Sequence, residues 1–485
     1  MKKRARSGLI WLGLIFAGGV VAVAAIGMIA SRRDSAAVQR IRERGELMVA
    51  RYERQFAGGP AAAEAPAEAD APGEGGQSGK AMTAAGQEPP AFSSAALALF
   101  ERLKEGVELA NSAPVHTDIR DLIEHKPPSE WTEADLRLVA EFLGAHAELI
   151  EEIRRLARLG EPVYQVDLSM GYATELPHLA PLRAMARLLQ MEAAFRAQSG
   201  DIDGAMEDFR AILGLSDTLV EEPLVISQLV RIATLTAMYD GLGSSLSPGQ
   251  LDPRDARAFV QELAGMYCRE ATANALITEA AFGMAAMEDM RNGASALVPD
   301  PASSITSLAG DSNFSNILGF VYQTPIGDVM LSADRQSYAE YMERLAQAAN
   351  APYYEVQGEL AAIDAEVGDE SIFSVCTQIL VPALTRVQRA QARGEAMIDL
   401  TRIGLALEAC HAETGAYPEN LNAVATDLGG AVPVDPFTGQ GYVYLPQGGS
   451  FILYSLGENG RDDGGRHDLR EGDIVWRGRE QQADP

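Results

Sequence analysis

Apolar and polar residues follow three patterns along the chain. Residues Gly8 to Ala30 form an uninterrupted uncharged run. From about residue 93 to 395, apolar residues recur three and four positions apart, the spacing of one helix face. Near the C-terminus, the alternating runs 442–445 and 451–454 flank the turn-rich residues 446–450, which predicts a β-hairpin. The pattern predicts a mainly α chain with a small C-terminal α+β unit.

The first run has the length of a transmembrane helix. Its 23 residues reach about 35 Å as a helix, enough to cross a bilayer core with some tilt. A cleaved signal peptide is the alternative, because a basic stretch precedes the run and Ala22-Val23-Ala24 fits a cleavage pattern. The apolar stretch continues past that site to Ala30, which favours a retained single-pass anchor. Basic residues flank both ends, so charge alone does not set the orientation. The signal-like start places the body outside the inner (cytoplasmic) membrane.

Composition divides the rest of the chain. We expect a cytoplasmic tail and transmembrane anchor at 1–33, a charged juxtamembrane helix at 34–56 and a linker rich in Ala, Gly, Pro and Glu at 57–92. A helical body at 93–395, an α+β domain at 396–478 and a short tail at 479–485 follow. The linker composition cannot bury a core, so it predicts a flexible tether between the anchor and the body.

Several helices of the body are marked by their sequence. Thr132 opens an amphipathic run that extends to residue 159. Residues 181–199 and 202–214 resemble one tetratricopeptide-type hairpin, with Ala205 and Phe209 at the packing positions. A second clear copy is missing, so we expect an irregular, partly tetratricopeptide-like array. Further helices are predicted at about 223–242, 252–292, 334–350 and 371–413, and a loop at 293–330.

Charge restricts the class of partner. Beyond residue 33 the chain carries 34 basic and 68 acidic residues, a formal net charge of −34. Such a body would repel phosphate backbones, so we expect no nucleic-acid partner. It is compatible with hard cations and with basic protein surfaces, although solubility alone also explains an acidic surface.

Sequence motifs for catalysis are absent. The six histidines are scattered and the three cysteines form no metal-binding spacing; Cys268 and Cys376 are expected in the core. The chain has no GxSxG, P-loop or dinucleotide fingerprint. The stripe of Met284, Met287 and Met290 is predicted to be buried core.

The C-terminal unit carries a family resemblance. Its elements, in order, are a helix with Leu405-Ala406-Leu407-Glu408, then 413–418, then Val434-Asp435-Pro436-Phe437, the hairpin, and 454–460 with a closing Asp473-Ile474. This order resembles the C-terminal domain of the major pseudopilin of type II secretion systems. The rest of the chain is similar to helical membrane proteins of planctomycete-type bacteria that carry the same tail, a resemblance that implies no activity. The anchor departs from the pseudopilin pattern, because Gly8 is not followed by the Glu of a pilin-type leader.

The resemblance implies a calcium site. In that family the loop after the Tyr-Ser-Leu-Gly strand binds calcium, which carries over to Asn459, Asp462, Asp463 and Asp473 here. Asn459 stands where the family usually has Asp, which removes one charge and should weaken binding. A Gly-rich acidic loop suits calcium on physical grounds, but a solvated acidic turn is an equal alternative.

The expected function is that of a membrane-anchored scaffold or adaptor without enzymatic activity, connected with type II secretion or pilus-like assembly through protein partners. The alternatives are a cell-envelope enzyme whose site is assembled from distant residues and a receptor for a small ligand. Pseudopilins assemble through their leader and the first half of their helix. That helix begins here far from the anchor, so filament incorporation is not expected.

Overall fold

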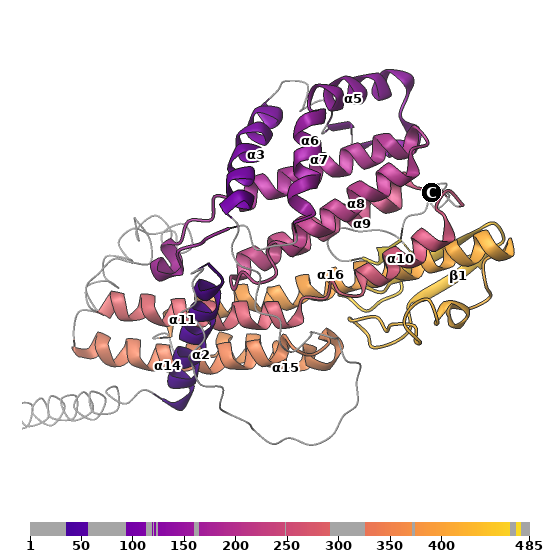
Figure 1. The fold of residues 1–485 in the computed structure, drawn as a ribbon. Coiled ribbons are helices and arrows are strands. Elements are labelled where there is room, and N and C mark those ends of the chain that lie inside the picture. The colour runs from indigo at the N-terminus through magenta and orange to yellow at the C-terminus, as the bar shows by residue number, and fades with distance from the viewer. Residues whose placement is uncertain are drawn as a thin grey trace, which may run out of the picture.

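The protein is mainly helical, with a small antiparallel sheet near its C-terminus (Figure 1). The computed structural model describes residues 35–56, 94–112, 119, 121–122, 125–159, 164–247, 249–291, 325–370, 374–465 and 472–476. The predicted anchor at 8–30 and the predicted linker at 57–92 lie outside these ranges. Within them, no helix has the length and apolar character that a membrane span requires.

One group of helices contains the predicted tetratricopeptide-like pair. The group consists of α3 (Ser94–Ser112), α5 (Glu133–Ala145), α6 (Ala147–Ala157), α7 (Leu179–Gln198), α8 (Ile202–Asp217) and α9 (Val225–Ser245), with short 3₁₀ turns η2 (Pro128–Glu130) and η3 (Leu168–Ala173). The helices α7 and α8 pack on each other and on α9. Ala205 and Phe209 are fully buried between them, as the sequence predicts.

The run that begins at Thr132 forms two helices rather than one. Thr132 caps α5 through a capping box with Asp135, which confirms the predicted start. The helical conformation breaks at His146, whose ring lies 4.5 Å from the ring of Phe142 and whose Nδ1 bonds to the Phe142 carbonyl at 2.8 Å. This local pairing ends α5, and α6 begins at the next residue.

A second group of helices lies below the first in Figure 1. It consists of α10 (Pro253–Leu263), α11 (Arg269–Arg291), α14 (Pro325–Ala348), α15 (Tyr353–Gly368) and α16 (Val375–Thr414). The predicted helix at 252–292 is therefore two helices, α14 begins before the predicted residue 334, and α15 is not foreseen from the sequence. The helix α16 packs against α9, α10, α14 and α15.

The predicted hairpin is confirmed. The strands β1 (Val443–Gln447) and β2 (Ser450–Ser455) pair antiparallel, and β3 (Ile474–Val475) adds to β2. The register places Val443 opposite Tyr454 and Gln447 opposite Ser450, which leaves a two-residue turn. Gly448 in this turn has a φ of +68°, a conformation that glycine adopts at little cost. The sheet packs on the C-terminal half of α16, after which the chain passes through η4 (Leu421–Val424).

Two hydrophobic clusters make up the core, and α16 contributes to both. Val381, Leu384 and Val387 belong to a cluster with α2 (Ala36–Phe56), α11, α14 and α15. Residues of α16 from Ala392 onward belong to a larger cluster that includes α7, α8, α9 and the sheet. At 40 residues, α16 is about 60 Å long, so it connects the two clusters directly.

The helix α2 is part of the folded body. It crosses α11 and α14, and its Val38 and Ile41 are almost completely buried (Figure 1). A Cβ at Gly45 would lie 2.5 Å from the Cβ of Ala281, so the two helices touch where they cross. Arg40 adds a bidentate ion pair with Glu343, at 2.7 and 2.6 Å. The predicted helix at 34–56 is thus present, but it is not held away from the body by a tether. The linker at 57–92 follows α2 and cannot separate it from the body.

Candidate functional site

The four residues of the predicted calcium site lie in and beside the loop that follows β2. Gly457, Gly460, Gly464 and Gly465 all have positive φ, which bends this loop back on itself. A Cβ at Gly457 would lie 2.5 Å from the carbonyl oxygen of Gly472, so the loop passes directly against the start of β3.

Three of the predicted ligands already have partners within the loop. The Asn459 side-chain amide donates to Asp463 Oδ2 at 3.0 Å, and the Arg461 amide donates to Asn459 Oδ1 at 2.8 Å. Asp462 Oδ1 accepts from the Tyr454 hydroxyl at 2.8 Å and from the Gly464 amide at 2.9 Å. These bonds give the loop a defined shape.

Asp473 is the exception. Its side chain is fully buried, and its Oδ2 accepts from the Gly465 amide at 2.8 Å. Its Oδ1 is buried and has no hydrogen-bond partner among the described residues, which omit 466–471. Burial raises the pKa of Asp473, and the nearby Asp463 and Asp462 raise it further against the lowering effect of the Gly465 and Asp463 amides. An orphaned carboxylate oxygen beside two other carboxylates is an arrangement that a cation would stabilise.

The described part of the chain contains no group of three or more His, Cys, Asp and Glu residues that could hold a metal ion. The four predicted ligands therefore do not form a complete carboxylate cage. A calcium ion at Asp473 would need loop carbonyls for much of its coordination, which the glycines permit. The donor set fits calcium in its chemistry, but not as a preformed cluster.

A second polar cluster, not foreseen from the sequence, joins the C-terminal unit to the helical body. Asp399 of α16 accepts hydrogen bonds from Tyr267, which precedes α11, and from Tyr442, which precedes β1; the Tyr442 bond is 2.9 Å long. The Arg402 guanidinium donates to the Tyr267 hydroxyl at 3.0 Å and to the Leu428 carbonyl at 3.0 Å. Burial raises the pKa of Asp399 to about 7, against the lowering effect of the two tyrosine hydroxyls and Arg402. No motif marks this cluster, because its side chains come from three distant segments.

Further contacts fix the same junction. The Tyr239 hydroxyl of α9 donates to the Val475 carbonyl of β3 at 2.6 Å. The Trp476 ring lies against Gly404, where a Cβ would come within 2.5 Å of the indole. Arg257 of α10 forms a bidentate ion pair with Glu413 near the end of α16, at 2.6 and 2.7 Å. The C-terminal unit is therefore held by apolar, polar and ionic contacts on several elements.

A Ser, a Glu and a His also meet at the start of α9. Glu222 accepts from the Ser227 hydroxyl and contacts His178 Nε2 at 2.9 Å. In a serine nucleophile site the histidine stands between the serine and the acid, because it must take the serine proton. Here the carboxylate stands in the middle, and all three side chains are buried. This arrangement satisfies a buried carboxylate and does not activate a nucleophile.

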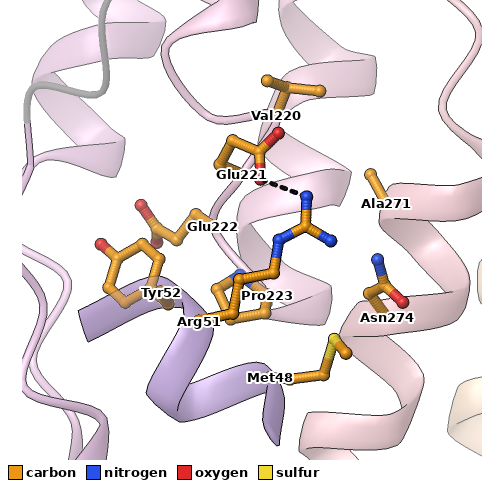
Figure 2. Close-up of a pocket in the computed structure, with 9 residues that line it drawn as sticks. All are labelled: Met48, Arg51, Tyr52, Val220, Glu221, Glu222, Pro223, Ala271 and Asn274. Atoms are coloured by element: carbon orange, nitrogen blue, oxygen red, sulfur yellow. Dashed lines mark ion pairs between the residues drawn. The ribbon is translucent and has the colours of Figure 1, made fainter. Parts of the chain in front are cut away.

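Figure 2 shows the small pocket beside Glu222, lined by residues of α2, α11 and the segment before α9. Its volume is about 30 Å³, the space of one water molecule. Arg51 reaches across it to Glu221 at 3.6 Å, whereas Glu222 turns toward Tyr52. The adjacent carboxylates Glu221 and Glu222 therefore serve different partners. The pocket is too small for a substrate and acts as part of the α2 contact.

Two other sequence predictions are borne out in this part of the fold. Met284 and Met287 are buried, and Cys268 and Cys376 are buried free thiols. The side chain of Met290 lies outside the described part.

Comparison with known proteins gives no family. No family model, curated protein or solved structure matches this chain.

Proposed function

We propose that this chain is a membrane-anchored, extracytoplasmic scaffold that holds its pseudopilin-like C-terminal unit at a fixed distance from the bilayer for protein partners, in the setting of type II secretion or pilus-like assembly. The observation that supports this most is the position of α2. This helix begins six residues after the end of the predicted anchor and packs into the core of the body. The packing of α2 would then fix the position of the helical body relative to the membrane anchor.

The length and packing of α16 support the second half of the proposal. In Figure 1, α2 crosses α11 and α14 in the left half of the body, and the sheet lies by the right-hand end of α16. A helix about 60 Å long, packed against α9, α10, α14 and α15, keeps that separation constant. The junction at Asp399 fixes the orientation of the sheet on this helix.

The rigid-mount proposal is tested by displacing α2. Gly45→Leu places a side chain where the Ala281 methyl group lies, so α2 cannot approach α11. Gly358→Leu is the matched control, because Gly358 of α15 has open space around it. A photoreactive residue at Leu445, which is 47% exposed on edge strand β1, reports partner contacts in native membranes.

We expect specific protein crosslinks from position 445 in the wild type and in Gly358→Leu, and their loss or redistribution in Gly45→Leu at equal membrane abundance. An unchanged crosslink pattern in Gly45→Leu would contradict a rigid mount. A chain recovered from the soluble fraction after high-salt washing of membranes would contradict the anchor.

We also propose calcium as a structural ion of the loop, supported by the orphaned Oδ1 of Asp473. Calcium should raise the thermal unfolding temperature of the wild type more than an equal concentration of magnesium does. Asp473→Ala should abolish the difference between the two ions, whereas the exposed Glu105→Gln should keep it. Equal responses to both ions in the wild type would leave the loop as a solvated acidic turn.

A further inference from the structure

A cleft runs along one side of α2, between this helix, α11 and η3. Its volume is about 500 Å³. From α2 it is lined by residues between Arg42 and Glu53 that lie three and four positions apart, and thus on one face of the helix. Val38 and Ile41, which enter the core, lie on the neighbouring face of α2. The helix therefore has two occupied faces, one against the protein and one along this cleft.

The walls of the cleft are mostly apolar. Val49 and Ala50 of α2 face Ala281, Phe282 and Ala285 of α11. Charged side chains stand at its ends and edges: Arg42, Glu46, Glu53, and the ion pair of Arg335 with Glu288 at 2.9 Å. The chemistry is that of an apolar channel with a polar rim.

The length and lining of the cleft favour one kind of occupant. The lining of α2 from Arg42 to Glu53 extends about 16 Å along the helix. An extended peptide would place its amide and carbonyl groups against apolar walls without partners. A hydrocarbon chain has no polar groups to satisfy.

The cleft lies close in sequence to the predicted membrane anchor, so membrane lipid is the nearest source of a hydrocarbon chain. The end of the cleft near Arg42 lies about two turns into α2, the helix that follows the predicted anchor. We propose that the cleft holds one acyl chain of a membrane lipid, with its headgroup at the exposed Arg42 end and its methyl end toward Glu53. This inference rests on the proposed membrane anchorage and adds a lipid-binding site to it.

The test uses the full chain in phosphatidylcholine nanodiscs that contain a phosphatidylcholine with a diazirine at the end of one acyl chain. After irradiation, lipid adducts are mapped by mass spectrometry. We expect adducts in two places: in residues 8–30, from the anchor, and on both cleft walls, within 46–53 and 281–288. Ala50→Trp combined with Ala285→Trp fills the cleft, since both alanines are exposed toward it, and should reduce the cleft adducts at least tenfold. Leu109→Trp on α3, where Leu109 is 72% exposed, is the control for a surface tryptophan.

The outcomes separate the two proposals. Adducts in 8–30 without cleft adducts would overturn the lipid site and keep the anchor, whereas the absence of adducts in 8–30 would overturn the anchor. Cleft adducts that persist in the filled variant would also overturn the site. A change of oligomeric state on filling would assign the cleft to a second copy of the chain, against this proposal. An unchanged thermal unfolding temperature shows that the filled variant is folded.

Discussion

Replacing Asp399 with Asn should remove a large part of the pH dependence of the junction. Asp399 is buried, and its pKa is about 7 in the folded protein instead of 3.8. Because the folded state binds this proton more tightly than the unfolded chain does, the free energy of unfolding falls as pH rises from about 4 to about 7. A difference of about three pKa units corresponds to about 4 kcal/mol. Asn has nearly the same shape and cannot ionise, so Asp399→Asn should not show this loss.

The assay is urea unfolding of the full chain in detergent micelles at intervals between pH 4.5 and 8.5. The quantity of interest is the difference in free energy of unfolding between Asp399→Asn and the wild type. Burial also raises the pKa of Asp208 and of Glu279 to about 7, but these groups are present in both proteins and cancel in the difference.

At pH 5 the Asn variant should be within about 1 kcal/mol of the wild type or somewhat less stable, because one tyrosine bond is weakened. Between pH 5 and pH 8 it should gain about 2–3 kcal/mol relative to the wild type, because the rest of the 4 kcal/mol is already lost below pH 5. The exposed Glu105→Gln, analysed in the same way, should follow the wild-type curve. A difference for Asp399→Asn that is constant across the whole range would refute the reasoning, because it would mean that Asp399 titrates alike in the folded and unfolded chain.

Three further changes test other contacts. Tyr239→Phe removes the donor to the buried Val475 carbonyl and should lower stability by about 1–3 kcal/mol, measured as a shift in the urea midpoint. Arg154→Met removes the 2.6 Å partner of the fully buried Asp208 and should cost about 3–5 kcal/mol above pH 7, with a smaller loss at pH 5 where Asp208 is protonated. Thr132→Ala removes the α5 cap and should cost about 1 kcal/mol, seen as faster amide hydrogen exchange in the first turn of α5.

The elements that the sequence predicts well are those whose signals are local. The cap at Thr132, the small residue and aromatic at Ala205 and Phe209, and the alternation around the Gly448 turn are each encoded within a few positions. Such signals act before tertiary packing, which is why the corresponding helices and the hairpin are found where they are expected. The break at His146 is missed, because a histidine in an amphipathic run carries no general breaking signal, and so are the break between α10 and α11 and the helix α15.

Long-range pairing explains what the sequence does not disclose. The side chains around Asp399 come from residues up to 175 positions apart, between Tyr267 and Tyr442, and none belongs to a motif. The contacts of α2 with the body also join residues far apart in the sequence, whereas its charged sequence suggests an exposed helix. Its contact with the body depends on Gly45, where the lack of a side chain lets Ala281 approach. For the predicted calcium ligands, spacing identifies the loop but does not determine how far Asp473 stands from the other carboxylates.

The packing of α16 separates this chain from the assembly role that its C-terminal resemblance would otherwise suggest. A pseudopilin uses its helix to pack against neighbouring subunits, which requires a free helix face. Here every residue from Gly394 to Leu407 is buried, so this part of α16 is surrounded on all sides by the same chain. The covering elements are α9, α10 and the sheet itself. To place this segment in a filament, the body would have to release the Asp399 junction and expose apolar surface along several turns. In the proposed scaffold, the surface open to a partner is therefore the outer surface of the C-terminal unit, such as the edge strand β1, while α16 is an internal support.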